Sequence, residues 1–261
     1  MSATHAASAR EVAALISGAP EQELDLLLDR YGDDPRRQVV HAIEAAVRRR
    51  DRARAERERV LGMYRLQDEL SGGGVVVGVD EVGRGALAGP LTIGAVVLPA
   101  EPIVWGINDS KQLSPKRRSE LAADIVCRAE AIGIAHVAPE AIDAVGMAAA
   151  LRVGMAQAVE DTGVDPDCVL IDGNPVHAHP KERTLVKGDA RIASIAAASI
   201  VAKVTRDDLM VGYSGEYPEY HLDECKGYGS PSHIEAIRMH GLTPLHRVSF
   251  CGNFIEPARL F

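Results

Sequence analysis

Apolar residues recur at helical spacing through the N-terminal part of the chain, and the pattern then changes to short β-type runs. The apolar positions at helical spacing are Val12, Leu15, Ile16, Leu24, Leu27 and Leu28. This spacing predicts amphipathic helices. After Ser71-Gly72-Gly73-Gly74, a stretch typical of a flexible junction, β-type and helical runs alternate. We therefore predict a helical N-terminal extension over residues 1–72 and an α/β domain over residues 73–261.

The α/β domain is predicted to contain strands and helices in alternation. The strands cover residues 75–80, 92–98, 132–137, 168–172 and 183–186. The helices cover residues 114–131, 139–159, 190–211 and 232–240. Ser114 and Pro115 form an N-cap followed by proline at the first helical position, and Gly146 predicts a break in the second helix. The longest apolar stretch, residues 192–202, is too short to span a bilayer.

The composition is that of an ordinary globular protein. The 261 residues are 46% hydrophobic and 25% charged, which excludes disorder throughout the chain. No two of the four cysteines are close enough in sequence for a Cys-x-x-Cys pair, and residues 1–5 lack the basic and apolar segments of a secretory signal. We therefore expect a cytoplasmic protein with reduced thiols and no membrane partner.

Net charge by itself argues against a nucleic-acid partner, because 29 Lys and Arg against 37 Asp and Glu give a net charge of -8. The distribution changes this inference. Residues 48–59 carry seven arginines against three acids, whereas residues 73–261 hold 17 basic and 24 acidic side chains. The arginine run either contacts a nucleic acid or a protein, or forms a solvated helix whose charges pair with one another. The sequence leaves both alternatives open.

Acidic residues follow several predicted strands. Asp80 and Glu81 end the first strand, Asp172 ends the fourth, and Asp189 follows the fifth. Strands that end at a shared edge of a sheet bring such side chains together, and clustered carboxylates repel unless cations neutralise them. Oxygen ligands without Cys or His favour Mg²⁺ or Mn²⁺. The alternative for each single acid is a turn or a helix cap, and Asp189 is placed to cap a helix starting at Ala190.

A glycine-rich segment, residues 83–89, follows the first strand. Its spacing is one residue longer than a dinucleotide-binding fingerprint, and it leads into a β-type run instead of a helix, so that function is disfavoured. The glycines allow close approach of a ligand to the backbone, with Arg84 placed to meet a phosphate or a sugar. The alternative is an ordinary glycine-rich hairpin turn.

These segments belong to a series of motifs that resembles the ribonuclease HII family. The motifs are GVDEVGRG at 78–85, DSKQLS at 109–114, IDG at 171–173, KGD at 187–189, IAAASIVAKVTRD at 195–207 and KGYG at 226–229. The resemblance implies an α/β, RNase H-like fold: a mixed five-stranded sheet flanked by helices, with a C-terminal helical region. The N-terminal helical extension is similar to one found in some bacterial members.

The resemblance also implies an activity. It implies an endonuclease that hydrolyses the RNA strand of RNA/DNA hybrids and nicks duplex DNA 5′ of a misincorporated ribonucleotide by a two-metal-ion mechanism, leaving a 3′-hydroxyl and a 5′-phosphate. The implied metal ligands are Asp80, Glu81, Asp172 and Asp189. The loop formed by Gly83, Arg84 and Gly85 is implied to read the 2′-hydroxyl, the group that distinguishes RNA from DNA. Tyr228 matches the tyrosine that stacks on the following sugar, and its alternative is a half-buried structural tyrosine.

Further polar residues are candidates for substrate contacts. Ser110 and Lys111 lie in a loop before a helix and are predicted to hold a substrate phosphate, and Lys187 either does likewise or offsets the acid cluster. Lys203 and Arg206 share a helical face, a weaker signal because most such charges are solvated. The histidines show no ligand spacing, and we attach no chemistry to the family-like pair His246-Arg247.

Two positions depart from the pattern of the family. Ala86 stands where many relatives have proline, and Ser230 stands where threonine is common. Neither change removes a chemical group that the predicted reaction needs. Two rival functions remain: a DNA-directed nuclease of the same fold, such as a junction resolvase or an integrase, and a non-catalytic protein that binds hybrids.

Overall fold

The computed structural model describes residues 7–255. Its helices are α1 (Ala9–Gly18), α2 (Glu21–Tyr31), α3 (Arg37–Ser71), α4 (Pro115–Arg128), α5 (Pro139–Val145), α6 (Met147–Asp161), α7 (Ala193–Ser214), α8 (Leu222–Cys225), α9 (Pro231–His240) and α10 (Val248–Cys251). The strands are β1 (Val76–Val82), β2 (Leu91–Val97), β3 (Ala131–Val137), β4 (Cys168–Asp172) and β5 (Glu182–Leu185), and single 3-10 turns are η1 (Ser110–Gln112), η2 (Gly188–Ala190) and η3 (Pro218–Tyr220). By its internal contacts the chain divides into two compact units, residues 1–59 and 60–261.

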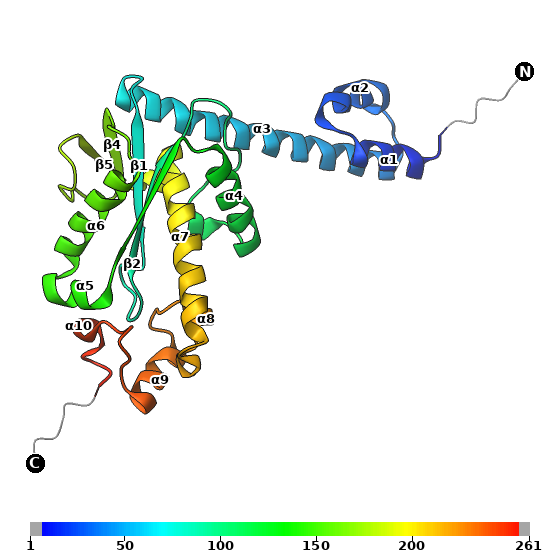
Figure 1. The fold of residues 1–261 in the computed structure, drawn as a ribbon. Coiled ribbons are helices and arrows are strands. Elements are labelled where there is room, and N and C mark those ends of the chain that lie inside the picture. The colour runs from blue at the N-terminus through cyan, green and yellow to red at the C-terminus, as the bar shows by residue number, and fades with distance from the viewer. Residues whose placement is uncertain (1–6, 256–261) are drawn as a thin grey trace, which may run out of the picture. The chain divides into compact units, whose positions relative to one another are not determined.

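One mixed sheet organises the second unit, in the order β3-β2-β1-β4-β5. Strand β2 is antiparallel to β1 and β3, whereas β1, β4 and β5 run parallel. Helices α4 and α7 pack on one face of the sheet, and α5 and α6 pack on the other (Figure 1). The predicted five-stranded mixed sheet flanked by helices is confirmed.

Helix α7 lies unusually close to the centre of the sheet. Its N-terminal half is rich in alanine and completely buried. Opposite it, Gly78 of β1 leaves room for the backbone of Ser194, with which a Cβ atom at that position would collide. Because side chains alternate along a strand, Gly78 and Asp80 face α7, while Val77 and Val79 face α6. The side chain of Asp80, the first of the predicted metal ligands, therefore points toward α7.

Local signals placed most of these elements well. Ser114 accepts a hydrogen bond from the Arg117 N–H as the N-cap of α4, and Gly146, with a φ of 77°, separates α5 from α6. The third predicted helix begins later than expected, at Ala193, because residues 188–190 form the turn η2 instead. Ile192 is therefore the N-cap residue, and Asp189 does not cap α7.

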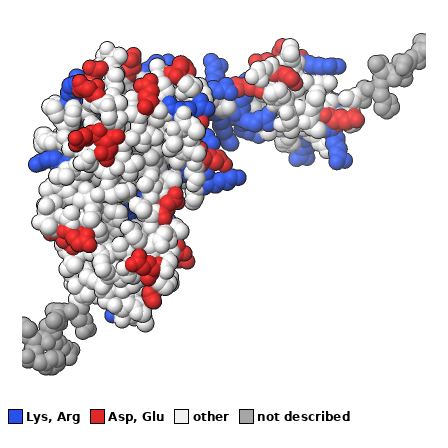
Figure 2. All heavy atoms as spheres, viewed as in Figure 1, with Lys and Arg blue, Asp and Glu red and all other residues white. Residues whose placement is uncertain are grey.

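The first unit is a small helical body. Its core consists of Val12, Ile16, Leu24, Val39, Ala42 and Ala46. Several arginines of α3 are engaged inside this unit: Arg49 donates to the carbonyls of Ser17 and Ala19, and Arg50 and Arg57 pair with acids of α2. Figure 2 shows many basic side chains on this unit, all of them arginines. Part of the arginine run therefore stabilises the unit itself, and its contact with a partner stays a prediction.

The last turns of α3 belong to the second unit. Val60 and Met63 are buried in the core between α4 and α7, and the Ser194 N–H donates to the Gln67 Oε1 atom at 2.9 Å. The compact units therefore divide inside α3, before the glycine junction at which we place the sequence boundary. No helix within residues 7–255 is long and apolar enough to cross a membrane.

Candidate active site

The register of the parallel strands brings two acids side by side. Val79 of β1 is paired with Ile171 of β4, so the next residues along these strands, Asp80 and Asp172, are neighbours. Both follow residues that face α6, and both therefore point toward the α7 face of the sheet. This is the shared edge that the strand-end pattern predicted, although β1 continues to Val82.

Asp80 is a buried acid with only 7% of its surface exposed. Burial, followed by the neighbouring Glu81 and Asp172 carboxylates, raises its pKa well above the usual range, while a hydrogen bond from the Ser199 hydroxyl opposes this shift. The Glu81 N–H also donates to the Asp80 Oδ1 atom, at 2.8 Å. A buried carboxylate with other carboxylates beside it is unstable as an anion unless a cation joins it.

Glu81 faces the other side of β1 and is paired with Arg84, whose Nη1 atom lies 3.6 Å from the Glu81 Oε1 atom. Its pKa is raised by burial and by Asp172, and lowered by Arg84 and Lys111. The guanidinium predicted to meet a phosphate or a sugar thus contacts an acid of the cluster. Arg84 remains largely exposed, so it can exchange this partner for another anion.

The turn η2 places Asp189 near the same group. The Gly188 N–H donates to the Asp172 Oδ1 atom at 2.6 Å and so ties the turn to the end of β4. The pKa of Asp189 is raised by burial, by Asp172 and by Asp109, and lowered by Lys111. All four predicted ligands are therefore electrostatically coupled through Asp172. Lys187, beside this turn, is exposed in a left-handed backbone conformation.

A cavity of about 480 Å³ lies between β1, α7, the glycine loop, the loop before α4 and the turn that carries Tyr228. It is lined by Asp80, Glu81, Val82, Gly83, Arg84, Gly85, Ser110, Lys111, Ser199, Lys203 and Tyr228. A second cavity, of about 350 Å³, shares Glu81 and Arg84 with it and adds Asp172, Asn174 and Arg152. The structure thus gathers most of the predicted site, whereas Asp189 and Lys187 line neither of these two cavities.

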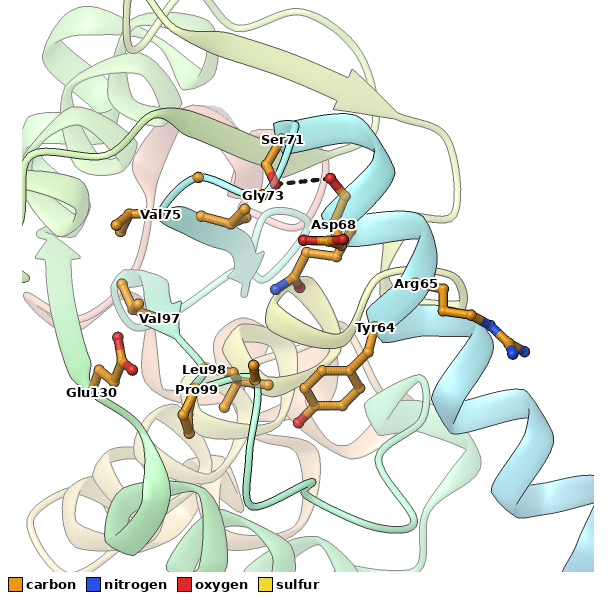
Figure 3. Close-up of a pocket in the computed structure, with 14 residues that line it drawn as sticks. Tyr64, Arg65, Asp68, Ser71, Gly73, Val75, Val97, Leu98, Pro99 and Glu130 are labelled. Atoms are coloured by element: carbon orange, nitrogen blue, oxygen red, sulfur yellow. Dashed lines mark hydrogen bonds between the residues drawn. The ribbon is translucent and has the colours of Figure 1, made fainter.

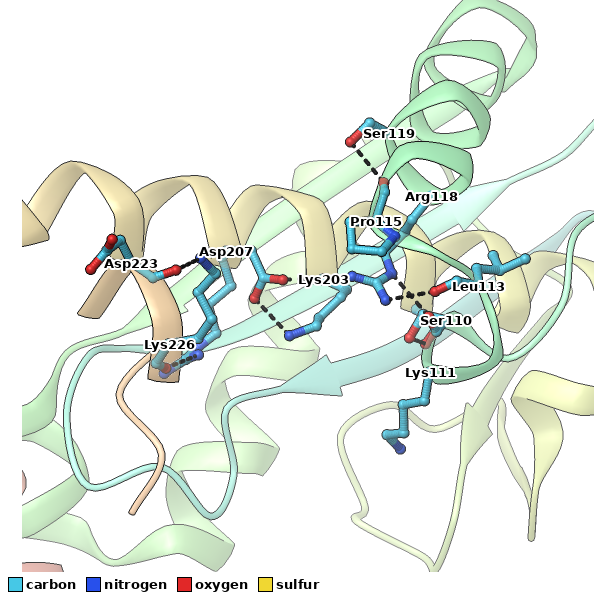
Figure 4. Close-up of polar contacts among 12 residues, drawn as sticks. Ser110, Lys111, Leu113, Pro115, Arg118, Ser119, Lys203, Asp207, Asp223 and Lys226 are labelled. Atoms are coloured by element: carbon cyan, nitrogen blue, oxygen red, sulfur yellow. Dashed lines mark hydrogen bonds and ion pairs between the residues drawn. The ribbon is translucent and has the colours of Figure 1, made fainter. Parts of the chain in front are cut away.

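The loop before α4 is held by a charged network (Figure 4). Arg118 donates to the carbonyls of Ser110 and Leu113, at 2.9 and 3.0 Å, and its Nη1 atom lies 3.7 Å from Asp207. Asp207 also pairs with Lys203, at 2.7 Å. Ser110 is 2% exposed, and its hydroxyl hydrogen-bonds the Ser199 hydroxyl. The loop therefore presents Lys111 to the cavity, while the Ser110 side chain anchors it.

Two buried arginines support the glycine loop. Arg206 donates to the carbonyls of Ala88, Pro90 and Lys226, at 2.8–3.0 Å, and Arg247 donates to the carbonyls of Gly89 and Arg84. A Cβ atom on Gly83, whose φ is 92°, would collide with Arg206. Arg206 is fully buried, in contrast to most charged residues on helix surfaces. Binding to several carbonyls offsets the cost of its burial.

The ring of Tyr228 packs against Arg206, one of these two buried arginines. Its ring centroid is 5.4 Å from the Arg206 Cζ atom, and the residue is 37% exposed at the rim of the cavity. Cation–π attraction from one side holds the ring and leaves surface for a ligand on the other. This placement leaves one face of the ring accessible to a ligand, and it is equally compatible with the alternative of a half-buried structural tyrosine.

Removing the Arg206 guanidinium should loosen the glycine loop and the turn at Lys226, because Arg206 binds carbonyls of both. We expect Arg206→Met to lower the free energy of unfolding by about 3 kcal/mol, because carbonyls are left buried without a donor. Arg206→Lys should recover only part of the loss, since one ammonium cannot reproduce the fork of the guanidinium. Urea denaturation measures both values. Arg128→Met, at an exposed i,i+4 pair with Asp124, is the matched control, and an equal loss in that variant would contradict the assignment.

Two histidines near these loops are buried as well. His246 lies against His233, with the Nε2 atoms 3.1 Å apart, and against the Tyr220 ring, and it precedes the buried Arg247. Burial and the neighbouring His233 lower its pKa from 6.5 to about 4. The unfolded chain therefore takes up this proton at a higher pH than the folded chain does. Stability that is complete above about pH 6.5 should be lost progressively toward pH 4.

We expect this loss to amount to about 3 kcal/mol, at 1.36 kcal/mol per pKa unit. The measurement is the free energy of unfolding of the wild type and of His246→Gln at pH 7 and pH 4.5. The difference in free energy of unfolding between the wild type and the variant should be smaller at pH 4.5, because the variant has no imidazole at this position to take up a proton when it unfolds. His240→Gln, at an exposed position, is the control. An advantage that does not change with pH would contradict the assignment.

Another hollow, of about 450 Å³, lies at the opposite end of β1 (Figure 3). It is lined by the end of α3, including Tyr64 and Asp68, by Val75 and Val76 before and at the start of β1, and by Glu130. None of the predicted site residues lines it. This hollow is therefore separate from the predicted site, which lies at the end of β1 that carries Asp80.

The donors of the acid cluster suit a hard cation, although the side chains do not form a completed metal site. Among residues 7–255, no group of three or more His, Cys, Asp and Glu side chains is arranged to hold a metal ion. The carboxylates nevertheless supply only oxygen donors. The pKa values of Asp80 and Asp189 are raised first by burial and then by neighbouring carboxylates, and a divalent cation would relieve both effects. Asp80, Glu81, Asp172 and Asp189 therefore fit Mg²⁺ or Mn²⁺ better than Zn²⁺.

Comparison with known proteins assigns the family. The family model for ribonuclease HII matches residues 77–253. The chain belongs to the ribonuclease HII family. Ribonuclease HII of Lactobacillus delbrueckii subsp. bulgaricus is 41% identical over 225 residues, which cover 86% of this chain and 88% of that protein. Membership of the ribonuclease HII family makes this protein a ribonuclease H, a metal-binding hydrolase and nuclease.

Solved structures of similar proteins agree with the fold. The ribonuclease H2 of Pyrococcus horikoshii superimposes with a TM-score of 0.60 at 26% identity, covering 69% of this chain and 96% of that one. Bst-RNase HIII in complex with Mn²⁺ superimposes with a TM-score of 0.53 at 18% identity, covering 67% of this chain and 66% of that one. The second likeness shows a shared fold.

The sequence analysis did not identify the buried residues that hydrogen-bond to the site residues and hold them in place. Ser199 contacts two predicted residues, and Arg206 and Arg247 hold the glycine loop. Serine within a run of alanines was the available signal for Ser199. Nothing local distinguished the two arginines from surface charges, because the carbonyls they bind belong to residues far away in the sequence.

Proposed function

We propose that this ribonuclease hydrolyses the RNA strand of RNA/DNA hybrids and nicks duplex DNA on the 5′ side of a misincorporated ribonucleotide, leaving a 3′-hydroxyl and a 5′-phosphate. The observation that carries the proposal is one cavity at which Asp80 and Glu81, both electrostatically coupled to Asp172, lie beside a glycine loop and an exposed aromatic ring. Carboxylates supply the hydrolytic chemistry, and the loop and the ring supply recognition of the sugar.

Two divalent ions, Mg²⁺ or Mn²⁺, are the proposed cofactors, with Asp80, Glu81, Asp172 and Asp189 as their ligands. When bound, such ions activate the attacking water and stabilise the leaving oxygen of a phosphodiester. The chain's own contribution is to hold these carboxylates within one electrostatic group. Ser199 and the Glu81 N–H fix the Asp80 carboxylate through hydrogen bonds, and the turn at Gly188 fixes that of Asp172.

Recognition of ribose falls to the backbone around Gly83, Arg84 and Gly85. A glycine loop lets peptide groups contact a 2′-hydroxyl without obstruction by side chains, and Arg247 stiffens it by binding the Arg84 carbonyl. Tyr228 presents the exposed face of its ring to the following sugar. A stacked ring favours a deoxyribose there, because the extra oxygen of a ribose would crowd it.

Lysines around the cavity are the proposed phosphate contacts. Lys111 lies at the end of the anchored loop, and Lys203 lies on α7, with its ammonium paired to Asp207. For the exposed Lys187 we propose a contact with a phosphate outside the cavity. We assign Ser110 a supporting part in this contact, since its hydroxyl already bonds Ser199.

The partners of the protein are therefore RNA/DNA hybrids and DNA that contains ribonucleotides. We propose the cytoplasm as its compartment. The four cysteines are free thiols, the form that a reducing compartment maintains. A few placed contacts and the cations then do most of the binding, in agreement with the net charge of -8.

Hydrolysis of a continuous hybrid is the first test. A labelled RNA annealed to DNA is incubated with the protein and Mg²⁺ or Mn²⁺, and a parallel reaction contains a chelator. We expect many turnovers with metal, none with the chelator, and no cleavage of the same RNA as a single strand. Hybrid that is bound but stays intact in the presence of either metal would favour the rival function of a non-catalytic binding protein.

A further inference from the structure

The buried histidines form a directed chain of hydrogen bonds. His233 lies in α9, and His246 lies in the segment between α9 and α10; both are at most 3% exposed. The Thr243 N–H donates to the His246 Nδ1 atom at 3.0 Å. The two Nε2 atoms are 3.1 Å apart, and the His233 Nδ1 atom lies 2.9 Å from the Tyr228 carbonyl oxygen. The chain therefore ends on the backbone of Tyr228.

Its direction follows from donor and acceptor roles. Nδ1 of His246 accepts from Thr243, so the proton of this neutral ring is on Nε2 and is donated to His233. Nε2 of His233 therefore accepts, and its own proton is on Nδ1, facing the Tyr228 carbonyl. Burial lowers the pKa of both rings, which keeps them neutral. One arrangement of protons thus satisfies every ring nitrogen.

Backbone contacts next to these histidines join the turn that carries Tyr228 to the glycine loop. The N–H groups of Leu87 and Ala88 donate to the Gly227 carbonyl at 2.8 and 3.1 Å, and Ala88 also forms an isolated β-bridge with His246. The turn, the loop and the segment that carries His246 therefore meet at one place. A shift of either imidazole would move the Tyr228 backbone relative to the loop that we propose reads the 2′-hydroxyl.

Packing alone does not explain this arrangement. Two polar rings are tolerated in the interior only when their nitrogens are hydrogen-bonded. Here the bonds lead to one carbonyl, which the Ser230 N–H also contacts at 2.8 Å. That carbonyl belongs to the residue whose ring lies at the rim of the cavity.

We propose that His233 and His246 are positioning residues that fix Tyr228 against the glycine loop and so determine how strictly the enzyme requires a deoxyribose after the ribonucleotide. The inference rests on the proposed function of Tyr228. Neither histidine touches substrate in this account. Each acts through the Tyr228 backbone, and a loss of positioning should therefore appear in substrate selectivity before it appears in general hydrolysis.

The test compares two substrates: duplex DNA with one ribonucleotide and a continuous RNA/DNA hybrid. The selectivity is the kcat/KM value for the ribonucleotide duplex divided by that for the hybrid. His233→Leu should lower this ratio by about tenfold, mainly through kcat on the single-ribonucleotide duplex. His233→Asn, whose amide N–H replaces the Nδ1 donor, should keep the ratio within about threefold of the wild type. His240→Leu, an exposed substitution on the same helix, should leave it unchanged.

A double-mutant cycle separates positioning from general damage. In a Tyr228→Ala background, His233→Leu should change the ratio no further. An equal loss in that background, or a folded His233→Leu variant with an unchanged ratio, would overturn the inference. Failure of the wild type to nick the ribonucleotide duplex would instead overturn the proposed function itself.

A second measurement needs only the wild-type protein and stays decisive if His233→Leu does not fold. Nitrogen-15 chemical shifts of the imidazoles report which ring nitrogen carries the proton. We expect the proton of His233 on Nδ1 and that of His246 on Nε2. A proton on Nε2 of His233 would leave no donor toward the Tyr228 carbonyl and would overturn the inference.

Discussion

Replacing Asp80 with asparagine should lower kcat on a hybrid by on the order of a thousandfold, equivalent to about 4 kcal/mol of transition-state stabilisation. Asparagine has nearly the same shape, but it removes the charge that the proposed ions require. The fold should remain intact, because the Asp80 carboxylate is buried beside other acids and its charge is disfavoured there, as its raised pKa indicates. We therefore expect a melting temperature equal to or above that of the wild type.

Steady-state kinetics at saturating Mn²⁺, together with thermal unfolding, measure both effects. The matched control is Asp165→Asn, because Asp165 is an exposed acid paired with Lys181. It should retain full activity and stability. A folded Asp80→Asn variant that hydrolyses hybrid at the wild-type rate would refute the assignment of this carboxylate as a metal ligand.

Two truncations should differ sharply in stability. Removing residues 1–59 leaves the second compact unit complete, so its melting temperature should stay close to that of the same unit in the full chain. Removing residues 1–72 also deletes Val60 and Met63, both fully buried against α4 and α7, and the Gln67 acceptor of Ser194. Loss of two such core side chains costs at least about 5 kcal/mol, a large part of the stability of a domain.

Circular dichroism and urea unfolding of the two truncated proteins make the comparison. The protein of residues 60–261 should unfold cooperatively, while that of residues 73–261 should be largely unfolded or should melt at a much lower temperature. Equal stability would show that the end of α3 adds nothing to the core. Comparing the hybrid affinity of residues 60–261 with that of the full chain over a range of salt concentrations then tests the arginine run separately.

Much of the fold follows from local pattern. Ser114 caps a helix and Gly146 interrupts one at the predicted positions, and β4 covers the predicted residues, because these signals depend on neighbours in the sequence. That Asp80 and Asp172 meet at one edge of the sheet was predictable as well, because acids that follow strands of one sheet are expected at a shared edge. The sequence did not indicate that β1 and β4 are direct neighbours.

The supporting residues were not predictable in this way. Arg206 and Arg247 have the sequence context of surface charges, and their burial depends on carbonyls of the glycine loop, more than a hundred residues earlier in the chain. The role of the end of α3 was unpredictable for the same reason, since it depends on contacts distant in the sequence. The last turns of α3 were assigned to the extension because the glycines follow them, although Val60 packs in the core of the second unit.

The central claim is that this site cuts only where it finds a 2′-hydroxyl. The most direct measurement uses three duplex DNAs of one sequence, which carry at one position a ribonucleotide, a deoxyribonucleotide or the arabino epimer with its hydroxyl on the opposite face. With Mg²⁺ or Mn²⁺, we predict a single nick 5′ of the ribonucleotide, ending in a 3′-hydroxyl and a 5′-phosphate, and intact strands in the other two. Equal cutting of all three would contradict the account and favour a DNA-directed nuclease of the same fold.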